Sequence, residues 1–228
     1  MFLSRRSMQA EYFDSDRPAA ELIEFFQSLQ RLNKLFAFGE PFQRLIPQLL
    51  GDSNCVSLSV LDLGAGDGSL GRVLIDWAVG RGWSWRIANL DSNFQALTLN
   101  RDGRNVTGSA LALPFRAGAF DLVVASQMTH HLADGEVKQL FREAWRVARQ
   151  GIVVCDLHRN PALYALLWLL FRCQRYPESF CADAILSVRR SWHVGEIRKL
   201  ARESGIAGAE ARLYFWARIV LLAKKHEE

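Results

Sequence analysis

Short apolar runs alternate with stretches of helical periodicity through the middle of the chain. Runs typical of buried strands lie near residues 57–62, 85–91, 104–107, 120–125 and 151–156. Apolar residues recur at helical spacing near residues 69–80, 93–99 and 134–149. Strands joined by helices in this order favour parallel pairing with right-handed crossovers. We therefore predict an α/β fold built on a doubly wound, mostly parallel sheet, completed by a hairpin at Ala207–Tyr214 and Phe215–Ala223.

The segments around this core are predicted to be helical. Apolar residues at helical spacing follow Pro18, and a second helix is expected to start at Pro41. We assign residues 1–55 to an N-terminal helical cap and residues 56–228 to a single domain. Within that domain, Pro161–Phe171 is almost wholly apolar, which predicts a helix that is buried, or that touches lipid or an apolar ligand. We place a lid insertion at about 158–192, before a helix at Val194–Ser204.

Composition restricts the class of protein further. The 228 residues, half of them apolar, suffice for one domain with a full core. No apolar run reaches the length of about 18 residues that a membrane span needs, and the N-terminus does not resemble a signal peptide. The four cysteines have no C-x-x-C spacing, so we expect reduced thiols and a cytoplasmic location. The net charge is +4, and the charged residues are scattered along predicted helices, which makes a nucleic-acid partner unlikely. The sequence does not predict the oligomeric state, and a homodimer is one of the alternatives.

The most informative stretch is Val60–Ser69, where an apolar strand leads through Asp62 into glycines at positions 64, 66 and 68. Such a turn before a helix holds a small molecule against the backbone, because a Cβ would keep the ligand away. Residues Gly66–Gly71 also form a literal G-x-G-x-x-G with Asp91 beyond it, as in a dinucleotide site. However, the carboxylates of Asp62 and Asp67 would face a pyrophosphate, and the repulsion between these negative charges would cost several kcal/mol at an effective dielectric of about 20. They suit S-adenosylmethionine, which carries an ammonium and a sulfonium.

The order of the motifs resembles the class I S-adenosylmethionine-dependent methyltransferases. Asp62-x-Gly64-x-Gly66-x-Gly68, Asp91, the stretch 108–115 and the strand at 120–125 match in sequence order. His130-His131-Leu132 is similar to a histidine pair in small-molecule enzymes of the quinone-biosynthesis type. The resemblance implies a Rossmann-like, seven-stranded sheet with S-adenosylmethionine as cofactor. The residues that it implies for cofactor binding are Asp62, Gly64, Ala65, Gly66, Gly68, Asp91, Ser92, Ser109, Ala110, Leu111 and Ser126, with Ser109 standing where the family usually has an aspartate.

Histidine is the natural base for removing a proton from an acceptor near neutral pH. We predict His130 as the catalytic base, with His158 as the second candidate, and His131, Asp156 and Arg159 as substrate contacts. Asp156 and Arg159 could instead pair with each other and hold the lid. No metal site is predicted, because Ser126-Gln127-Met128 offers no carboxylate to magnesium.

The acceptor is expected to be a hydrophobic small molecule of phenolic or quinol-like character. Aromatic residues in the cap and the apolar helix at 161–171 favour it. The stretches Leu32–Leu35 and Asp156–Arg159 are also similar to bacterial methyltransferases associated with phenolic polyketides and quinones. An RNA methyltransferase, an NAD-dependent oxidoreductase and a non-catalytic domain of the same fold remain as alternatives.

Overall fold

A seven-stranded sheet forms the centre of the computed structural model, which describes residues 3–101, 103–206 and 208–225. The strand order is β3-β2-β1-β4-β5-β7-β6; β1 to β5 are parallel, and β7 runs antiparallel to both neighbours. This confirms the predicted doubly wound sheet with a closing hairpin, although Ala207 lies outside the described residues. The strands are β1 Ser57–Leu63, β2 Ser84–Asp91, β3 Arg104–Thr107, β4 Phe120–Ser126, β5 Ala148–Leu157, β6 Glu210–Tyr214 and β7 Arg218–Lys224.

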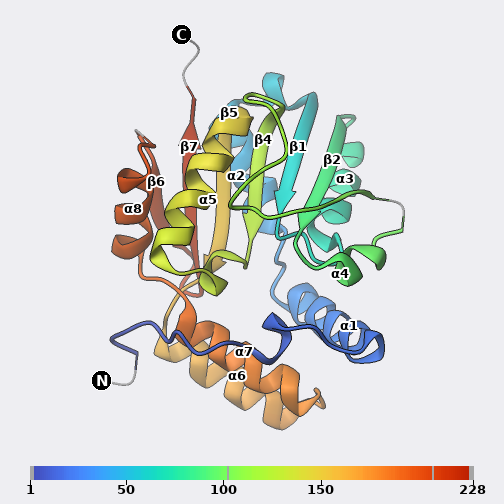
Figure 1. Ribbon diagram of the computed structural model, residues 1–228, viewed down its shortest axis with the longest axis vertical. Helices are drawn as coiled ribbons and strands as arrows, with labels where there is room; N and C mark the ends of the chain where they lie inside the picture. Colours follow the sequence, from blue (N-terminus) through green and yellow to red (C-terminus); the bar gives the residue numbers. More distant parts are fainter. Residues whose placement is uncertain (1–2, 102, 207, 226–228) are drawn as a thin grey trace.

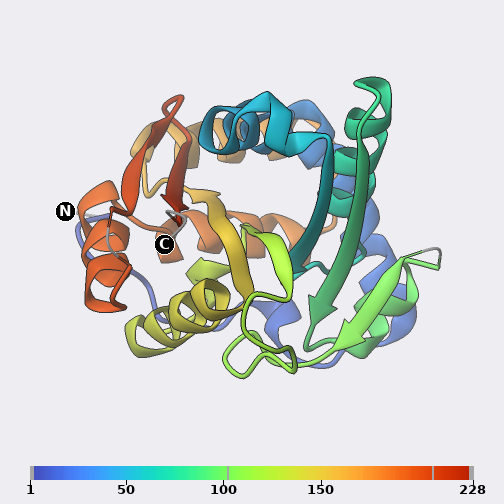
Figure 2. The same ribbon diagram turned by 90° about the horizontal axis from the view of Figure 1, so that it is seen from above.

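Helices cover both faces of the sheet, as seen from above in Figure 2. One face packs against α2 (Glu40–Leu50) and α3 (Ser69–Gly80), and the other against α5 (Asp134–Val147) and α8 (Val194–Glu203). The short helix α4 (Phe94–Thr98) contacts β2 and β3. Each face therefore has its own apolar cluster, which explains why the central strands are apolar on both sides.

A third layer lies at the edge of the sheet where the parallel strands end. In Figure 1, α1 (Ala19–Leu35), α6 (Pro161–Cys173) and α7 (Glu178–Arg190) lie beneath the arrowheads of β1 and β2. Leu32, Leu163 and Phe180 join these three helices in a small apolar cluster of their own. The short 3₁₀ turns are η1 Tyr12–Asp14, η2 Asp52–Cys55 and η3 Thr129–His131.

The N-terminal region differs from its prediction as a single cap. α1 and the segments on either side of it lie at the cleft edge, whereas α2 buries Phe42, Leu45 and Ile46 against the sheet. Of the two options predicted for the apolar helix α6, complete burial is wrong, since the helix buries Leu163 and Leu167 but leaves Trp168 about half exposed. No helix in the described ranges is both long and apolar enough to cross a bilayer.

Candidate active site

A cleft of about 420 Å³ opens at the carboxyl ends of β1, β2 and β4. Parallel α/β sheets bind ligands at this edge, because the strand-end loops there diverge. The structure brings most of the sequence-predicted cofactor residues together in the lining of this cleft: Asp62, Gly64, Ala65, Gly66, Asp91, Ser92, Ser109, Ala110, Leu111 and Ser126.

The glycine loop after β1 needs glycine for two physical reasons. Gly64, Gly66 and Gly68 have φ angles of 66°, 54° and 72°, a region that other residues rarely adopt. A Cβ on Gly66 would also lie 2.8 Å from Phe26 of α1. Gly68 does not line the cleft; it shapes the start of α3, where a Cβ would lie 2.2 Å from Asn100.

Asp91, at the end of β2, fastens this loop to the neighbouring strand. Its Oδ2 accepts a hydrogen bond from the Gly66 amide at 2.7 Å, and its Oδ1 accepts one from the Asn93 amide at 2.8 Å. An ionised carboxylate has about four acceptor positions, so both oxygens keep capacity for a ligand's hydroxyl groups.

Asp62 is a buried carboxylate, and no cation is found beside it in the part of the chain that the structure describes. Its side chain is 1% exposed, and Oδ2 has no hydrogen-bond partner within the described residues. Burial, followed by the nearby charges of Asp91 and Asp67, raises the pKa of Asp62 well above its usual range. The described residues that line the cleft include no Lys or Arg. A cationic group such as the ammonium of S-adenosylmethionine fits this position, whereas a pyrophosphate does not.

His130 enters the same cleft from η3, held by a buried carboxylate. Its Nδ1 lies 2.6 Å from Asp156 Oδ1, and its backbone amide donates to Asp156 Oδ2 at 3.0 Å. Although burial would raise the pKa of Asp156, His130 and the Thr129 hydroxyl hold it below its usual range. Because the Asp156 carboxylate holds Nδ1, the Nε2 atom of the His130 ring points away from Asp156, and it lies 3.8 Å from Glu11 Oε1.

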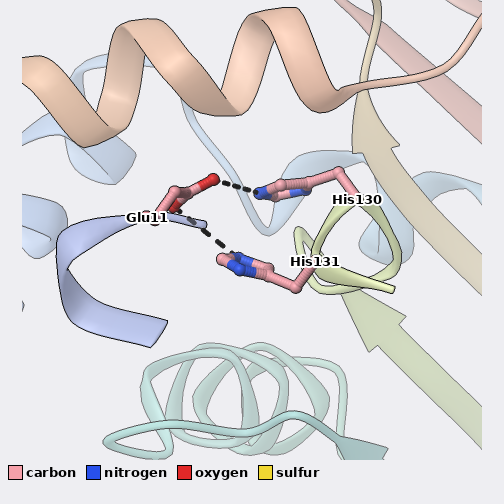
Figure 3. A group of neighbouring side chains, drawn as sticks. All are labelled: Glu11, His130 and His131. Carbon is pink, nitrogen blue, oxygen red and sulfur yellow. Dashed lines mark ion pairs between the residues drawn. The ribbon is translucent and has the colours of Figure 1, made fainter. Parts of the chain in front are cut away.

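Two acidic residues of the N-terminal segment, Glu11 and Asp14, lie against His130 and His131. Nothing in the sequence around them predicts this contact. Glu11 is 7% exposed, and its Oε2 lies 4.0 Å from His131 Nε2 (Figure 3). Burial raises the pKa of Glu11 to about 7, against the opposing effects of His131 and Arg190. Asp14 Oδ1 lies 2.6 Å from His131 Nδ1, and Asp14 also pairs with Arg190 at 2.5 Å.

Three predicted site residues lie elsewhere. His158 lines neither the cleft nor the adjoining pocket; its Nδ1 faces the Trp216 carbonyl at 3.1 Å. Arg159 does not pair with Asp156; it is 1% exposed and binds Glu196 at 2.6 Å and the Leu3 carbonyl at 3.0 Å. Asp156 supports His130 from beneath the cleft surface instead of lining it. The geometry is therefore against direct substrate contact by any of the three, since adjacency to a strand end does not fix which way a side chain points.

An apolar pocket of about 80 Å³ adjoins the cleft between α1, α6 and α7. Phe36, Leu163, Leu167 and Phe180 supply much of its wall. The residues that line both cavities are Glu11, Phe25, Leu29, Asn33, Gln127 and Ser187. The lid thus adds an apolar extension to an acidic cleft.

Comparisons with known proteins agree with this arrangement. A family described as a methyltransferase domain matches residues 61–155, which run from β1 to β5. Over this segment the chain is similar to S-adenosylmethionine-dependent methyltransferases. The cofactor named for such enzymes is S-adenosyl-L-methionine.

At the sequence level, a curated relative matches only part of this chain. A demethylmenaquinone methyltransferase of Roseiflexus sp. is 31% identical over 121 residues, which are 49% of each chain. The match thus spans about half the length of that relative.

Solved structures with this fold cover more of the chain. A putative S-adenosyl-L-methionine-dependent methyltransferase of Methanococcus maripaludis superposes with a TM-score of 0.64 at 18% identity, covering 96% of this chain and 99% of the other. Magnesium protoporphyrin IX methyltransferase of Synechocystis with bound SAH gives 0.55 at 17% identity, covering 82% and 83%. At these identities the likeness shows the fold alone.

Proposed function

We propose that this methyltransferase transfers a methyl group from S-adenosylmethionine to a hydrophobic small molecule of phenolic or quinol-like character. The observation that carries the proposal is the apolar pocket between α1, α6 and α7, which opens onto the cleft beside His130. The name of the Roseiflexus relative, demethylmenaquinone methyltransferase, supports an acceptor of this kind.

The strand-end loops are the proposed cofactor side of the cleft. When bound, S-adenosylmethionine supplies an activated methyl group on a sulfonium. Asp62 would balance its ammonium, Gly64 and Gly66 would let it approach the backbone, and Asp91 would accept from its ribose. Ser92, Ser109, Ala110, Leu111 and Ser126 line the rest of this side.

On the acceptor side, the proposed task of the protein is to orient the acceptor and remove its proton. Apolar walls exclude water from the acceptor ring and favour one orientation of its body. His130 is the proposed proton acceptor, because Asp156 holds Nδ1 and leaves Nε2 available near Glu11. His131 lies beside it, with its ring centroid 4.2 Å from that of His130.

The acidic cleft disfavours both alternative substrates. Glu11, Asp14, Asp62, Asp67 and Asp91 all line it, whereas RNA and NAD would bring phosphates. The cytoplasmic location and the possible homodimer stay predictions from the sequence.

Two measurements test this proposal. In calorimetry, we expect S-adenosylhomocysteine to bind and NAD not to bind. With radiolabelled S-adenosylmethionine and cell-extract fractions, we expect label in the organic-extractable fraction. Label in RNA would overturn the acceptor class, binding of NAD alone would indicate an oxidoreductase, and binding of neither would indicate a non-catalytic domain.

A further inference from the structure

Glu11, His130 and His131 come from distant parts of the chain and direct one ligand atom each toward a common point. The carboxylate of Glu11 lies 3.8 Å from His130 Nε2 and 4.0 Å from His131 Nε2 (Figure 3). The three ligand atoms lie within 4.8 Å of one another. The sequence gives no sign of this cluster, because Glu11 stands in a polar segment ahead of α1, more than 100 residues from either histidine.

Hydrogen bonding does not account for how these three atoms face one another. Each histidine has its Nδ1 on a second carboxylate at 2.6 Å, Asp156 for His130 and Asp14 for His131. A carboxylate only accepts, so Nδ1 carries a proton, and whenever the ring is neutral its Nε2 presents a lone pair. In that state two lone pairs face a third acceptor, and in either state the distances of 3.8 and 4.0 Å are too long for hydrogen bonds.

The charge around the cluster favours a cation at its centre. Glu11, Asp14 and Asp156 contribute three carboxylates, and Arg190 is the cation nearest to them, 3.7 Å from Glu11 and 2.5 Å from Asp14. Arg6 lies nearby but pairs with Asp134 at 2.8 Å. With neutral imidazoles, a dication would offset the remaining negative charge.

The donor set and its surroundings match those of protein metal sites. Ligand atoms that are each about 2.0–2.2 Å from a zinc ion lie roughly 3.3–4 Å apart, so side chains spaced within 4.8 Å would move only slightly closer together around an ion. Histidine ligands in such sites usually donate their other ring N–H to a carboxylate, as both do here. Glu11, His130 and His131 all line the cleft, so an ion could enter from solvent.

We propose that Glu11, His130 and His131 bind one divalent transition-metal ion of the class that prefers imidazole, such as zinc. Two imidazoles and a carboxylate leave coordination positions open, as in catalytic metal sites. Glu11 also lines the apolar pocket, so the open positions face the place proposed for the acceptor. An acceptor oxygen bound there would be oriented by the ion; while an ion is bound, His130 Nε2 is a ligand, and it can act as the base proposed above only in the metal-free protein. The binding of the ion itself does not depend on the identity of the acceptor.

Metal binding by the full chain tests this site without any activity measurement. Protein stripped with a chelator is titrated with Zn²⁺ by calorimetry and then dialysed for metal analysis; Co²⁺ serves as the spectroscopic probe. We expect one Zn²⁺ per chain and a Co²⁺ spectrum of imidazole and oxygen ligands. His131→Ala and Glu11→Gln should each weaken Zn²⁺ binding at least tenfold, and Asp14→Asn should weaken it by about 10–100-fold.

His158→Ala is the matched control, because His158 is outside the cleft and faces the Trp216 carbonyl. His158→Ala should bind Zn²⁺ with the affinity of the unchanged protein. Cys173→Ser should do the same, which would exclude Zn²⁺ binding at this exposed thiol. Binding of S-adenosylhomocysteine is measured on the unchanged protein and on every variant, and we expect all of them to bind it. If the unchanged protein does not bind it, the result counts against the proposed function and not against the metal site. No Zn²⁺ retained, preference for Mg²⁺, or equal loss in His158→Ala and His131→Ala would overturn the proposal. If Glu11→Gln does not fold, His131→Ala with Asp14→Asn decides the question.

Discussion

The two sides of the cleft are built in different ways. The cofactor side comes from loops that directly follow β1, β2 and β4 in the sequence, and backbone amides tie Gly66 to Asp91. The acceptor side joins η1, α1, η3, α6 and α7, which meet only in the folded protein. On the proposed cofactor side, the shape of the cleft depends on strand-end geometry; on the proposed acceptor side, it depends on how helices pack. Substitutions on the second side can therefore change the cavity without disturbing the sheet.

The largest expected effect is on the acceptor side. His130→Ala should lower the rate of methyl transfer by about 10²–10⁴-fold, because it removes the imidazole that takes the proton or holds an ion. Asp156→Asn should reproduce much of this loss, since an amide no longer fixes Nδ1 as the protonated nitrogen. Transfer of radiolabel under single-turnover conditions measures both.

His158→Ala serves as the reference for these variants, because it removes a histidine that follows β5 but lies outside the cleft. An equal loss of rate in His158→Ala and His130→Ala would contradict the assignment. Binding of S-adenosylhomocysteine should stay unchanged in both.

The cofactor side should respond to Asp91→Ala with about a 100-fold weaker binding of S-adenosylhomocysteine. The variant loses charge-assisted hydrogen bonds worth about 1.5–3 kcal/mol each, and it releases the Gly66 amide. Asp121→Ala is a matched control, since Asp121 also accepts a strand-end amide, from Ser59 at 2.8 Å, but lies at the opposite end of the strands. Calorimetry should show unchanged affinity for Asp121→Ala; a comparable loss would mean that general destabilisation explains both.

The same division decides how much the sequence could predict. Periodicity predicted the strands, and glycine spacing with Asp62 and Asp91 predicted which residues line the cleft at the ends of β1 and β2, because these features act locally on the backbone. Glu11 and Asp14 were not predicted, since single acidic residues in a polar segment acquire their role only through contact with His130 and His131. His158 shows the opposite error: position after a strand suggested a site, but the turn directs the ring toward Trp216.

The apolar pocket predicts a smaller effect on acceptor specificity. Ala184→Leu adds bulk to a pocket-lining position on α7, and the steric loss should be about 1–3 kcal/mol, or about tenfold or more in kcat/KM. Ala182→Leu makes the same change at an exposed position of the same helix and should have no effect. Steady-state kinetics with an extracted acceptor compares the two. Equal behaviour of the variants would show that the acceptor does not enter this pocket.

Asp62→Asn should produce the smallest effect and the most specific one, since it is expected to stabilise the protein while weakening cofactor binding. Burial raises the pKa of Asp62, so above the ordinary aspartate pKa of about 4 the folded state resists ionisation and loses stability as the pH rises. The amide has no charge to bury, and a gain of about 1 kcal/mol corresponds to about 2–4 °C in Tm for a domain of this size.

Thermal unfolding without cofactor should show this gain at pH 8 and a smaller one at pH 5. Calorimetry should show weaker binding of S-adenosylhomocysteine to the same variant. A lower Tm at pH 8, or an unchanged affinity for S-adenosylhomocysteine, would mean that groups of the protein itself neutralise the Asp62 carboxylate. Asp62 would then not be available to pair with a cationic ligand.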